Sequence, residues 1–427
     1  MHPVDHTGGP ARSSHVGSDA MPSFPEHGLA PAELIAEMRR RKEGDADWRG
    51  GKTWSLVYKT DDDDVVKVLE DAYALYLYEN ALNPFAFPSL REYESEVVDW
   101  VADMLHAPAS VGGSMSSGGT ESIFLAMQVA RDRAKAERGI THTEVVVPIT
   151  AHPAFDKAAH YLDIDLKKAP LRDDLRVDVG ALTDLITDNT ALVVGSAPCY
   201  PFGVIDPIEE IAAAAAARGV PCHVDACLGG FVLPFWERLG EPLPLWDFRV
   251  EGVTSISADV HKYGYAVKGA STVIHRSADA LKYQLFLVSD WVGGIYGSMT
   301  TAGTRPAGPI AAAWAVLRHL GVEGYVRLTQ VVLDTTRALQ KGIDAIDGLH
   351  VKGSPDASTF AFGSDELDIF AVCDVMDEKG WRLDRQPDSL HVIVMPQHAR
   401  IADQFLADLA EAVASHGESK GKEARYA

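Results

Sequence analysis

A lysine beside a histidine follows an apolar run in the middle of the chain. Residues 255–265 read Ser-Ile-Ser-Ala-Asp-Val-His-Lys-Tyr-Gly-Tyr, which places Lys262 in a turn after a predicted strand. A lysine that forms a Schiff base must lose its proton part of the time, which requires a desolvated or positively charged setting. Lys262, with His261 as part of its setting, is therefore a candidate amine nucleophile. The alternative is a buried, ion-paired structural lysine.

Asp225 lies upstream of this lysine, in the segment His-Val-Asp-Ala-Cys at 223–227. We expect it at the carboxyl end of a buried strand, the edge at which open α/β sheets bind ligands. A carboxylate buried there needs a partner that offsets its desolvation. A protonated pyridine nitrogen is one such partner, and a helix cap or an arginine is another.

Two further segments carry groups that suit a phosphorylated aromatic ligand. Residues 117–120 read Ser-Gly-Gly-Thr at a predicted helix start, where unpaired N–H groups can bind a phosphate. No lysine follows these glycines, so they do not form a nucleotide P-loop. His152 lies at a strand–helix junction, from which an imidazole can stack on a ring. Each feature taken alone also fits an ordinary turn or cap.

The four features together are more specific than any one of them. In chain order they offer a phosphate cradle, a stacking histidine, an acid for a pyridine nitrogen, and a lysine 37 residues after that acid (262 − 225). This is the equipment that pyridoxal 5′-phosphate requires. The four cysteines form no CxxC pair, no metal-ligand spacing is present, and HExxH and GxSxG elements are lacking. We therefore expect no metal site.

The elements that must position these residues alternate along the chain. Strands are predicted at 144–149, 191–196, 221–224, 253–257 and 271–275, and helices at 121–138, 154–162, 179–186 and 208–218. Such alternation is typical of an α/β domain with a mainly parallel sheet. The expected domains are an arm at 1–30, a helical segment at 31–105, a large α/β domain at 106–308, a small α+β domain at 309–416 and a tail at 417–427.

Composition limits the partners. The chain has 427 residues, 46% of them hydrophobic, and a net charge of −22. An acidic surface repels nucleic acid, which normally needs a basic face. We predict no signal peptide and no apolar stretch long enough to span a bilayer, and we expect a cytoplasmic location.

The motifs resemble the sphingosine-1-phosphate lyase branch of the pyridoxal-phosphate-dependent group II decarboxylase family. The resemblance runs from about residue 51 to 320 and is carried by residues 117–122, 151–158, 195–207, 223–231, 257–269 and 293–305. It implies a fold-type I architecture, like that of aspartate aminotransferase, with a large mostly parallel sheet domain and a smaller C-terminal domain. It also implies an obligate homodimer with shared active sites.

Residue roles follow from the same resemblance. Catalysis is expected from Lys262, His152 and Asp225, with Tyr200 as a possible assistant. The expected cofactor contacts are Ser117, Gly118, Gly119, Thr120, His152, Asp225, His261, Lys262, and Gly303 and Thr304, the last two reaching the partner's site. Tyr58, Lys268 and Tyr296 are the expected substrate contacts. A third phosphate position, a histidine of the family, has no counterpart in residues 83–89.

The implied activity is a lyase that cleaves the Cα–Cβ bond of an amino alcohol or β-hydroxy amine, phosphorylated or not, with an aldehyde as product. The alternative is an α-decarboxylase acting on an L-amino acid, because the bond held perpendicular to the cofactor ring decides which one breaks. A remote alternative is a non-catalytic regulatory subunit. An aldehyde product indicates the lyase, and carbon dioxide with an intact side chain indicates the decarboxylase.

Overall fold

The computed structural model of the protein describes residues 23–83, 85–419, 421 and 424. The chain divides into two units, residues 1–46 and residues 47–427. The first unit contains helix α1 (Pro31–Lys42), which buries none of its residues. The expected N-terminal arm, residues 1–30, lies largely outside the described residues, as does more than half of the expected tail at 417–427.

The second unit is built around a seven-stranded sheet with the order β1-β7-β6-β5-β4-β2-β3. Neighbouring strands from β6 to β3 are parallel, and β7 is antiparallel to both β6 and β1. The strands are β1 (Gly112–Ser116), β2 (Glu144–Pro148), β3 (Asp165–Ala169), β4 (Thr190–Ser196), β5 (Cys222–Asp225), β6 (Val253–Ala258) and β7 (Ser271–His275).

Both faces of this sheet are covered, as expected for a mainly parallel sheet. Side chains alternate between the faces along each strand. On β2, Val145 and Val147 pack in one hydrophobic cluster with residues of α4 and α5, whereas Val146 belongs to a second cluster that includes residues of α7 and α8. The helices of the domain are α4 (Gly119–Arg138), α5 (Ala154–Leu162), α6 (Val179–Asp184), α7 (Ile208–Ala217), α8 (Leu233–Arg238) and α9 (Leu281–Gln284).

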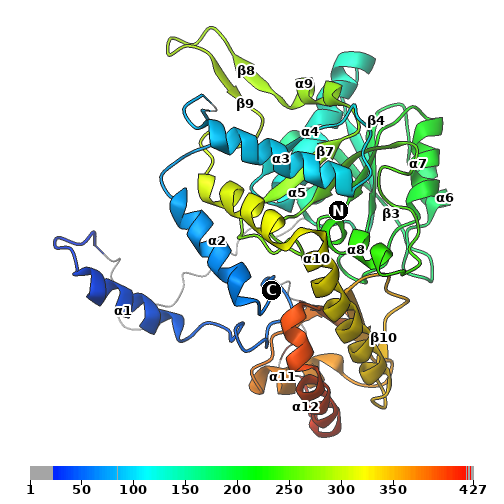
Figure 1. Ribbon diagram of the computed structural model, residues 1–427. Helices are drawn as coiled ribbons and strands as arrows, with labels where there is room; N and C mark the ends of the chain where they lie inside the picture. The colour runs from blue at the N-terminus through cyan, green and yellow to red at the C-terminus, as the bar shows by residue number, and fades with distance from the viewer. Residues whose placement is uncertain (1–22, 84, 420, 422–423, 425–427) are drawn as a thin grey trace. The chain divides into compact units, whose positions relative to one another are not determined.

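Three long helices pack together outside the sheet: α2 (Asp63–Leu75) and α3 (Pro88–Met104) both contact α10 (Ala307–Asp344). Helix α10 has a kink at Gly321, whose φ of 54° and ψ of −176° are not helical. In Figure 1 its ribbon runs from beside α2 and α3 towards α11 (Ile369–Glu378) and α12 (Ala402–Ser415). Residues of α10 from Ala307 to Leu333 contribute to the core of the sheet domain, and Leu339 and Ile343 contribute to the core of the part of the chain that follows α10.

That following part contains a four-stranded antiparallel sheet with the order β10-β11-β13-β12. Its elements are β10 (His350–Val351), β11 (Thr359–Gly363), α11 (Ile369–Glu378), β12 (Asp384–Gln386), β13 (Ser389–Ile393) and α12 (Ala402–Ser415). Its core includes Trp54, which comes from the segment before α2. The domain boundary expected at residue 308 stays a prediction.

The predicted elements can be compared with these bounds. Helix α5 and strand β7 have the predicted limits, and the other predicted strands and helices of the sheet domain differ at their ends by a few residues at most. Strands β1 and β3 were not predicted, and neither was the hairpin of β8 (Phe286–Val288) and β9 (Tyr296–Ser298). In the part of the chain that the structure describes, no helix has the length and apolar character needed to cross a membrane.

Candidate active site

A cavity of about 300 Å³ lies where strands β1, β4, β5 and β6 end. These four strands run in the same direction, so their carboxyl ends meet at one edge of the sheet. The lining residues include nine of the predicted site residues and several that were not predicted. They are Ser117, Gly118, Gly119, Thr120, Glu121, Ile123, His152, Ser196, Pro198, Tyr200, Asp225, Cys227, Leu228, Asp259, His261 and Lys262.

The glycine segment forms the start of α4, as predicted. Helix α4 begins at Gly119, so the first amide groups of a 20-residue helix face this end of the cavity. A Cβ on Gly119 would lie 2.8 Å from both the Asp259 carboxylate and the Cys227 sulfur. Only glycine fits there, so the start of α4 packs directly against these two residues of the cavity wall.

The variant Gly119→Ala is expected to bind a phosphorylated cofactor more weakly. The added methyl group would shift the start of α4 or the residues it meets. We expect a loss of affinity of about tenfold, which corresponds to about 1.4 kcal/mol. Titration of the purified protein with pyridoxal 5′-phosphate, followed by absorbance, measures the change.

Gly180→Ala is the matched control, because Gly180 lies in α6 and a Cβ there would meet only the Asp178 carboxylate, at 3.2 Å. Equal affinity of the Gly119→Ala protein and the wild type would contradict the cradle assignment.

Asp225 is the last residue of β5 and is 7% exposed. One of its carboxylate oxygens accepts hydrogen bonds from the Cys227 amide at 3.1 Å and from the Ser257 hydroxyl at 3.3 Å. These bonds hold the carboxylate at the cavity wall, as expected for a group that faces a positively charged ring nitrogen.

His152 lies between β2 and α5 and lines the same cavity. Its Nδ1 accepts a hydrogen bond from the Ala154 amide at 3.1 Å, so a neutral ring carries its proton on Nε2. Burial lowers the pKa of His152, and this effect outweighs the nearby Asp225 carboxylate, which raises it. The ring is therefore uncharged at neutral pH, which suits stacking on an aromatic cofactor.

Lys262 lies in the turn after β6 and forms an ion pair with Asp259, whose Oδ2 is 3.0 Å from the lysine Nζ. Burial opposes the charge of Lys262, but the Asp259 carboxylate outweighs it and raises the lysine pKa well above its usual value. The Nδ1 of His261 is buried and has no hydrogen-bond partner among the described residues. Asp259 was not predicted as a site residue, although it belongs to the motif that identified Lys262.

Two of the predicted substrate contacts lie close together beside Lys262. The Lys268 ammonium lies 4.4 Å from the centre of the Tyr58 ring. The Tyr58 ring packs edge-on against the Tyr263 ring, with 5.9 Å between the ring centres. Partial burial, together with the charge of Lys262, lowers the pKa of Lys268 to about 8. Lys268 keeps exposed surface, so an anion can reach it from solvent.

Neither Tyr58 nor Lys268 is among the residues that line the cavity, and the remaining predicted contacts do not line it either. Tyr296 lies on β9, and a Cβ on Gly303 would meet the Tyr296 hydroxyl at 2.6 Å. Gly303 lines a separate hollow with Met299 and Arg305, among others. Thr301, two residues before Gly303, is connected to the glycine segment through Glu121. The Glu121 carboxylate accepts hydrogen bonds from the amides of Ser117 and Thr301, at 2.6 and 2.8 Å.

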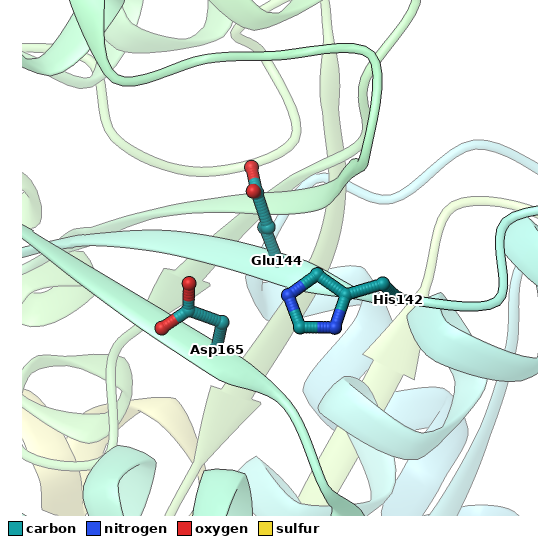
Figure 2. Close-up of side chains that lie close together, drawn as sticks. All are labelled: His142, Glu144 and Asp165. Carbon is teal, nitrogen blue, oxygen red and sulfur yellow. The ribbon is translucent and has the colours of Figure 1, made fainter.

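A group of possible metal ligands lies elsewhere on the sheet. Figure 2 shows His142, Glu144 and Asp165, whose ligand atoms lie within 4.8 Å of one another. The Glu144 carboxylate already pairs with Lys167 at 2.7 Å and accepts a hydrogen bond from Thr187 at 2.5 Å. A cation there would compete with the lysine ammonium, so we assign no metal to this group.

Comparison with known proteins identifies the family. A family model described as "Pyridoxal-dependent decarboxylase conserved domain" matches residues 53–362. The chain belongs to this family. Sphingosine-1-phosphate lyase of Arabidopsis thaliana is 44% identical over 399 residues, which cover 91% of this chain and 73% of the relative.

Solved structures agree with this assignment. The sphingosine-1-phosphate lyase of Burkholderia pseudomallei superposes with a TM-score of 0.88 at 41% identity, covering 92% of this chain and 93% of the other. The glutamate decarboxylase of Lactobacillus brevis has a TM-score of 0.82 at 24% identity over 95% and 98% of the two chains, which supports the fold alone. The expected fold-type I architecture is confirmed, and the chain is a pyridoxal-phosphate-dependent lyase.

The residues at the cavity fit this cofactor. The helix start at Gly119 and the unpartnered His261 nitrogen would provide donors for its phosphate, and Lys262 would provide the amine for its aldehyde. Asp225 would provide the acid for its ring nitrogen, and His152 would provide a neutral ring to stack on it. The individual roles carried over from the family stay predictions.

Proposed function

We propose that the protein cleaves the Cα–Cβ bond of a phosphorylated, long-chain β-hydroxy amine and releases an aldehyde. The observation that carries this proposal is the Lys268–Tyr58 pair beside Lys262, because it offers a positive group for a substrate phosphate next to the reactive amine. Relatives named sphingosine-1-phosphate lyases, about 40% identical over nine-tenths of the chain, support it.

The chain's own residues have separate roles in the proposed reaction. The bound cofactor supplies an electron sink for the pair of electrons left by the broken bond. Asp225 keeps a proton on the ring nitrogen, and His152 holds the ring from one face. The Lys262 ammonium, paired with Asp259, would be the group that supplies a proton to the substrate carbon. Tyr200 is the candidate for contacting the substrate's β-hydroxyl as its proton leaves. His152 is not, because its Nδ1 accepts a hydrogen bond from the Ala154 amide and its Nε2 carries the ring proton.

The test is product analysis on phosphorylated and unphosphorylated amino alcohols and on amino acids. The proposal predicts an aldehyde and a phosphorylated amine from the phosphorylated substrate. Release of carbon dioxide with an intact side chain would instead support an α-decarboxylase, the activity for which the family model is named.

Binding of the phosphorylated substrate is expected to weaken as the pH rises. Lys268 is charged below its pKa of about 8 and neutral above it. KM should therefore increase as the pH passes through about 8, and Lys268→Ala should raise KM at lower pH. Loss of a charge-assisted hydrogen bond costs about 1.5–3 kcal/mol, or roughly 10- to 150-fold in affinity.

Lys59→Ala is the control, because Lys59 adjoins Tyr58 in sequence but pairs with Asp61 at 3.1 Å. An unchanged KM and pH profile in Lys268→Ala would remove the phosphate role from Lys268 and leave the Cα–Cβ cleavage to be judged by its products.

We further propose that the protein acts as a homodimer in which Gly303, Thr304 and Tyr296 serve the partner's site. Support comes from large apolar side chains exposed on and around the β8–β9 hairpin: Phe286, Leu287, Trp291, Val292 and Ile295. A patch of this kind marks an interaction surface.

All four cysteines are free and buried, which supports the proposed cytoplasmic location, where thiols stay reduced.

A further inference from the structure

The Tyr200 hydroxyl is bound by a carboxylate from the C-terminal part of the chain. Tyr200 lies in the loop after β4 and lines the cavity beside His152. Its hydroxyl donates a hydrogen bond to Oδ2 of Asp384 at 2.5 Å. Asp384 is the first residue of β12, 184 residues further along the chain. The contact therefore joins the active-site cavity directly to the four-stranded sheet.

Asp384 is buried and fully engaged. It is 3% exposed, and its other oxygen accepts a hydrogen bond from the Ser55 hydroxyl at 2.9 Å. Burial opposes its charge, but hydrogen bonds from His391, Tyr200 and Ser55 outweigh burial and hold the pKa of Asp384 below its usual range. The carboxylate is thus ionised, and it can only accept hydrogen bonds.

His391 completes the arrangement from β13. Its Nδ1 lies 3.3 Å from the Asp384 carboxylate, to which it must donate, and its Nε2 lies 2.7 Å from the Thr359 hydroxyl. Its ring centre is 4.3 Å from that of Tyr200, with 30° between the planes. The same pair of residues therefore fixes both the ring and the hydroxyl of Tyr200.

This geometry determines what Tyr200 can offer to a substrate. A phenol has one O–H group to donate in a hydrogen bond, and in Tyr200 this group donates to Asp384. Towards any further group, the Tyr200 oxygen acts as an acceptor. An acceptor is what a substrate's β-hydroxyl needs when its O–H bond weakens during Cα–Cβ cleavage.

We propose that Asp384 and His391 are positioning residues, which hold Tyr200 so that its hydroxyl oxygen accepts the hydrogen bond of the substrate's β-hydroxyl. The inference rests on the proposed function for the identity of that hydroxyl. It assigns to the four-stranded sheet a direct part in the reaction, through two residues that line no part of the cavity.

The test compares Asp384→Asn with Tyr200→Phe and with the double variant. Asp384→Asn is expected to lower kcat by about 10- to 100-fold, because small misplacements of reacting groups have effects of this size. KM and cofactor content should stay near the wild-type values. The double variant should lose no more than Tyr200→Phe alone, since Asp384 acts through Tyr200.

Asp356→Asn is the matched control. Asp356 Oδ2 accepts a hydrogen bond from the Ile205 amide at 2.8 Å and pairs with Arg176 at 2.6 Å. It therefore ties the same loop to the part of the chain after α10 without contacting Tyr200. The control is expected to lose some stability and to keep kcat.

A second readout is independent of turnover. In protein labelled with ¹³C at the tyrosine ζ carbon, the Tyr200 resonance, identified by its absence in Tyr200→Phe, should move in Asp384→Asn and stay in place in Asp356→Asn. If Asp384→Asn fails to fold, His391→Gln carries the same test, with a smaller shift and a smaller loss of kcat expected.

The proposal is overturned if the resonance does not move, if Asp384→Asn retains the kcat of Asp356→Asn, or if the Asp384 and Tyr200 effects add. Failure of the proposed function would look different. The wild type would then cleave no phosphorylated amino alcohol, while the resonance would still report whether Asp384 holds Tyr200.

Discussion

The variant Lys262→Ala is expected to lose about four orders of magnitude or more in turnover, because it loses both the amine that captures the cofactor and the group that moves a proton. It should also lose covalent attachment of the cofactor. Borohydride reduction followed by mass analysis of the peptide containing residue 262 measures the attachment without any substrate. The structure provides the reason for selectivity, since Lys262 is the lysine that lines the described cavity.

Lys268→Ala is the matched control for attachment. Lys268 is a nearby lysine with a lowered pKa of about 8, so it is the competing amine for the cofactor aldehyde. The Lys268→Ala protein should still fix the cofactor at residue 262. A Lys262→Ala protein that keeps the borohydride-reducible link and the native rate would contradict the assignment of the site.

The candidate site was largely predictable because each of its main residues lies at or after the end of a strand. The glycine segment, His152 and Lys262 come directly or shortly after β1, β2 and β6, and Asp225 is the last residue of β5. The carboxyl ends of these strands lie at one edge of the sheet. Alternating strands and helices therefore bring together residues that are far apart in sequence. A short motif at each strand end then identifies the chemistry.

Two strands of the same sheet were not predictable from local pattern. Strand β1 reads Gly-Gly-Ser-Met-Ser and has no β-branched residue, and it forms because it pairs antiparallel with β7. Strand β3 reads Asp-Leu-Lys-Lys-Ala and lies at the open edge of the sheet, with charged side chains that suit an edge. In both cases, tertiary pairing outweighs weak intrinsic preference.

The Tyr200 support was not predictable for a different reason. Asp384 and His391 belong to no motif, and their meeting with Tyr200 depends on how the four-stranded sheet packs on the loop after β4. Gly203 marks that close approach, because a Cβ on it would lie 1.7 Å from the Thr359 carbonyl oxygen. A glycine with positive φ in such a loop is a weak signal, and it does not name its partner.

The second large effect is expected at Asp225. We expect Asp225→Asn to lower kcat by roughly two to four orders of magnitude. Breaking a buried charge pair costs about 3–5 kcal/mol, and each 1.4 kcal/mol is a factor of about ten in rate. Without the carboxylate, the ring nitrogen of the bound cofactor holds its proton less firmly, so the cofactor accepts electrons less well. The absorbance of the bound cofactor, recorded against pH, reports this change independently of turnover.

Asp206→Asn separates this electronic effect from simple loss of a buried carboxylate. Asp206 is 1% exposed and accepts hydrogen bonds from the Ser196 and Val177 amides, at 2.9 and 3.1 Å. Burial raises its pKa to about 6. Asp206 binds the amide of Ser196, the last residue of β4, but it does not line the cavity. The Asp206→Asn variant should therefore lower stability and leave the cofactor spectrum unchanged. If both variants gave the same spectrum and the same kcat, Asp225 would be a structural carboxylate, and the electron sink would have to be maintained by another group.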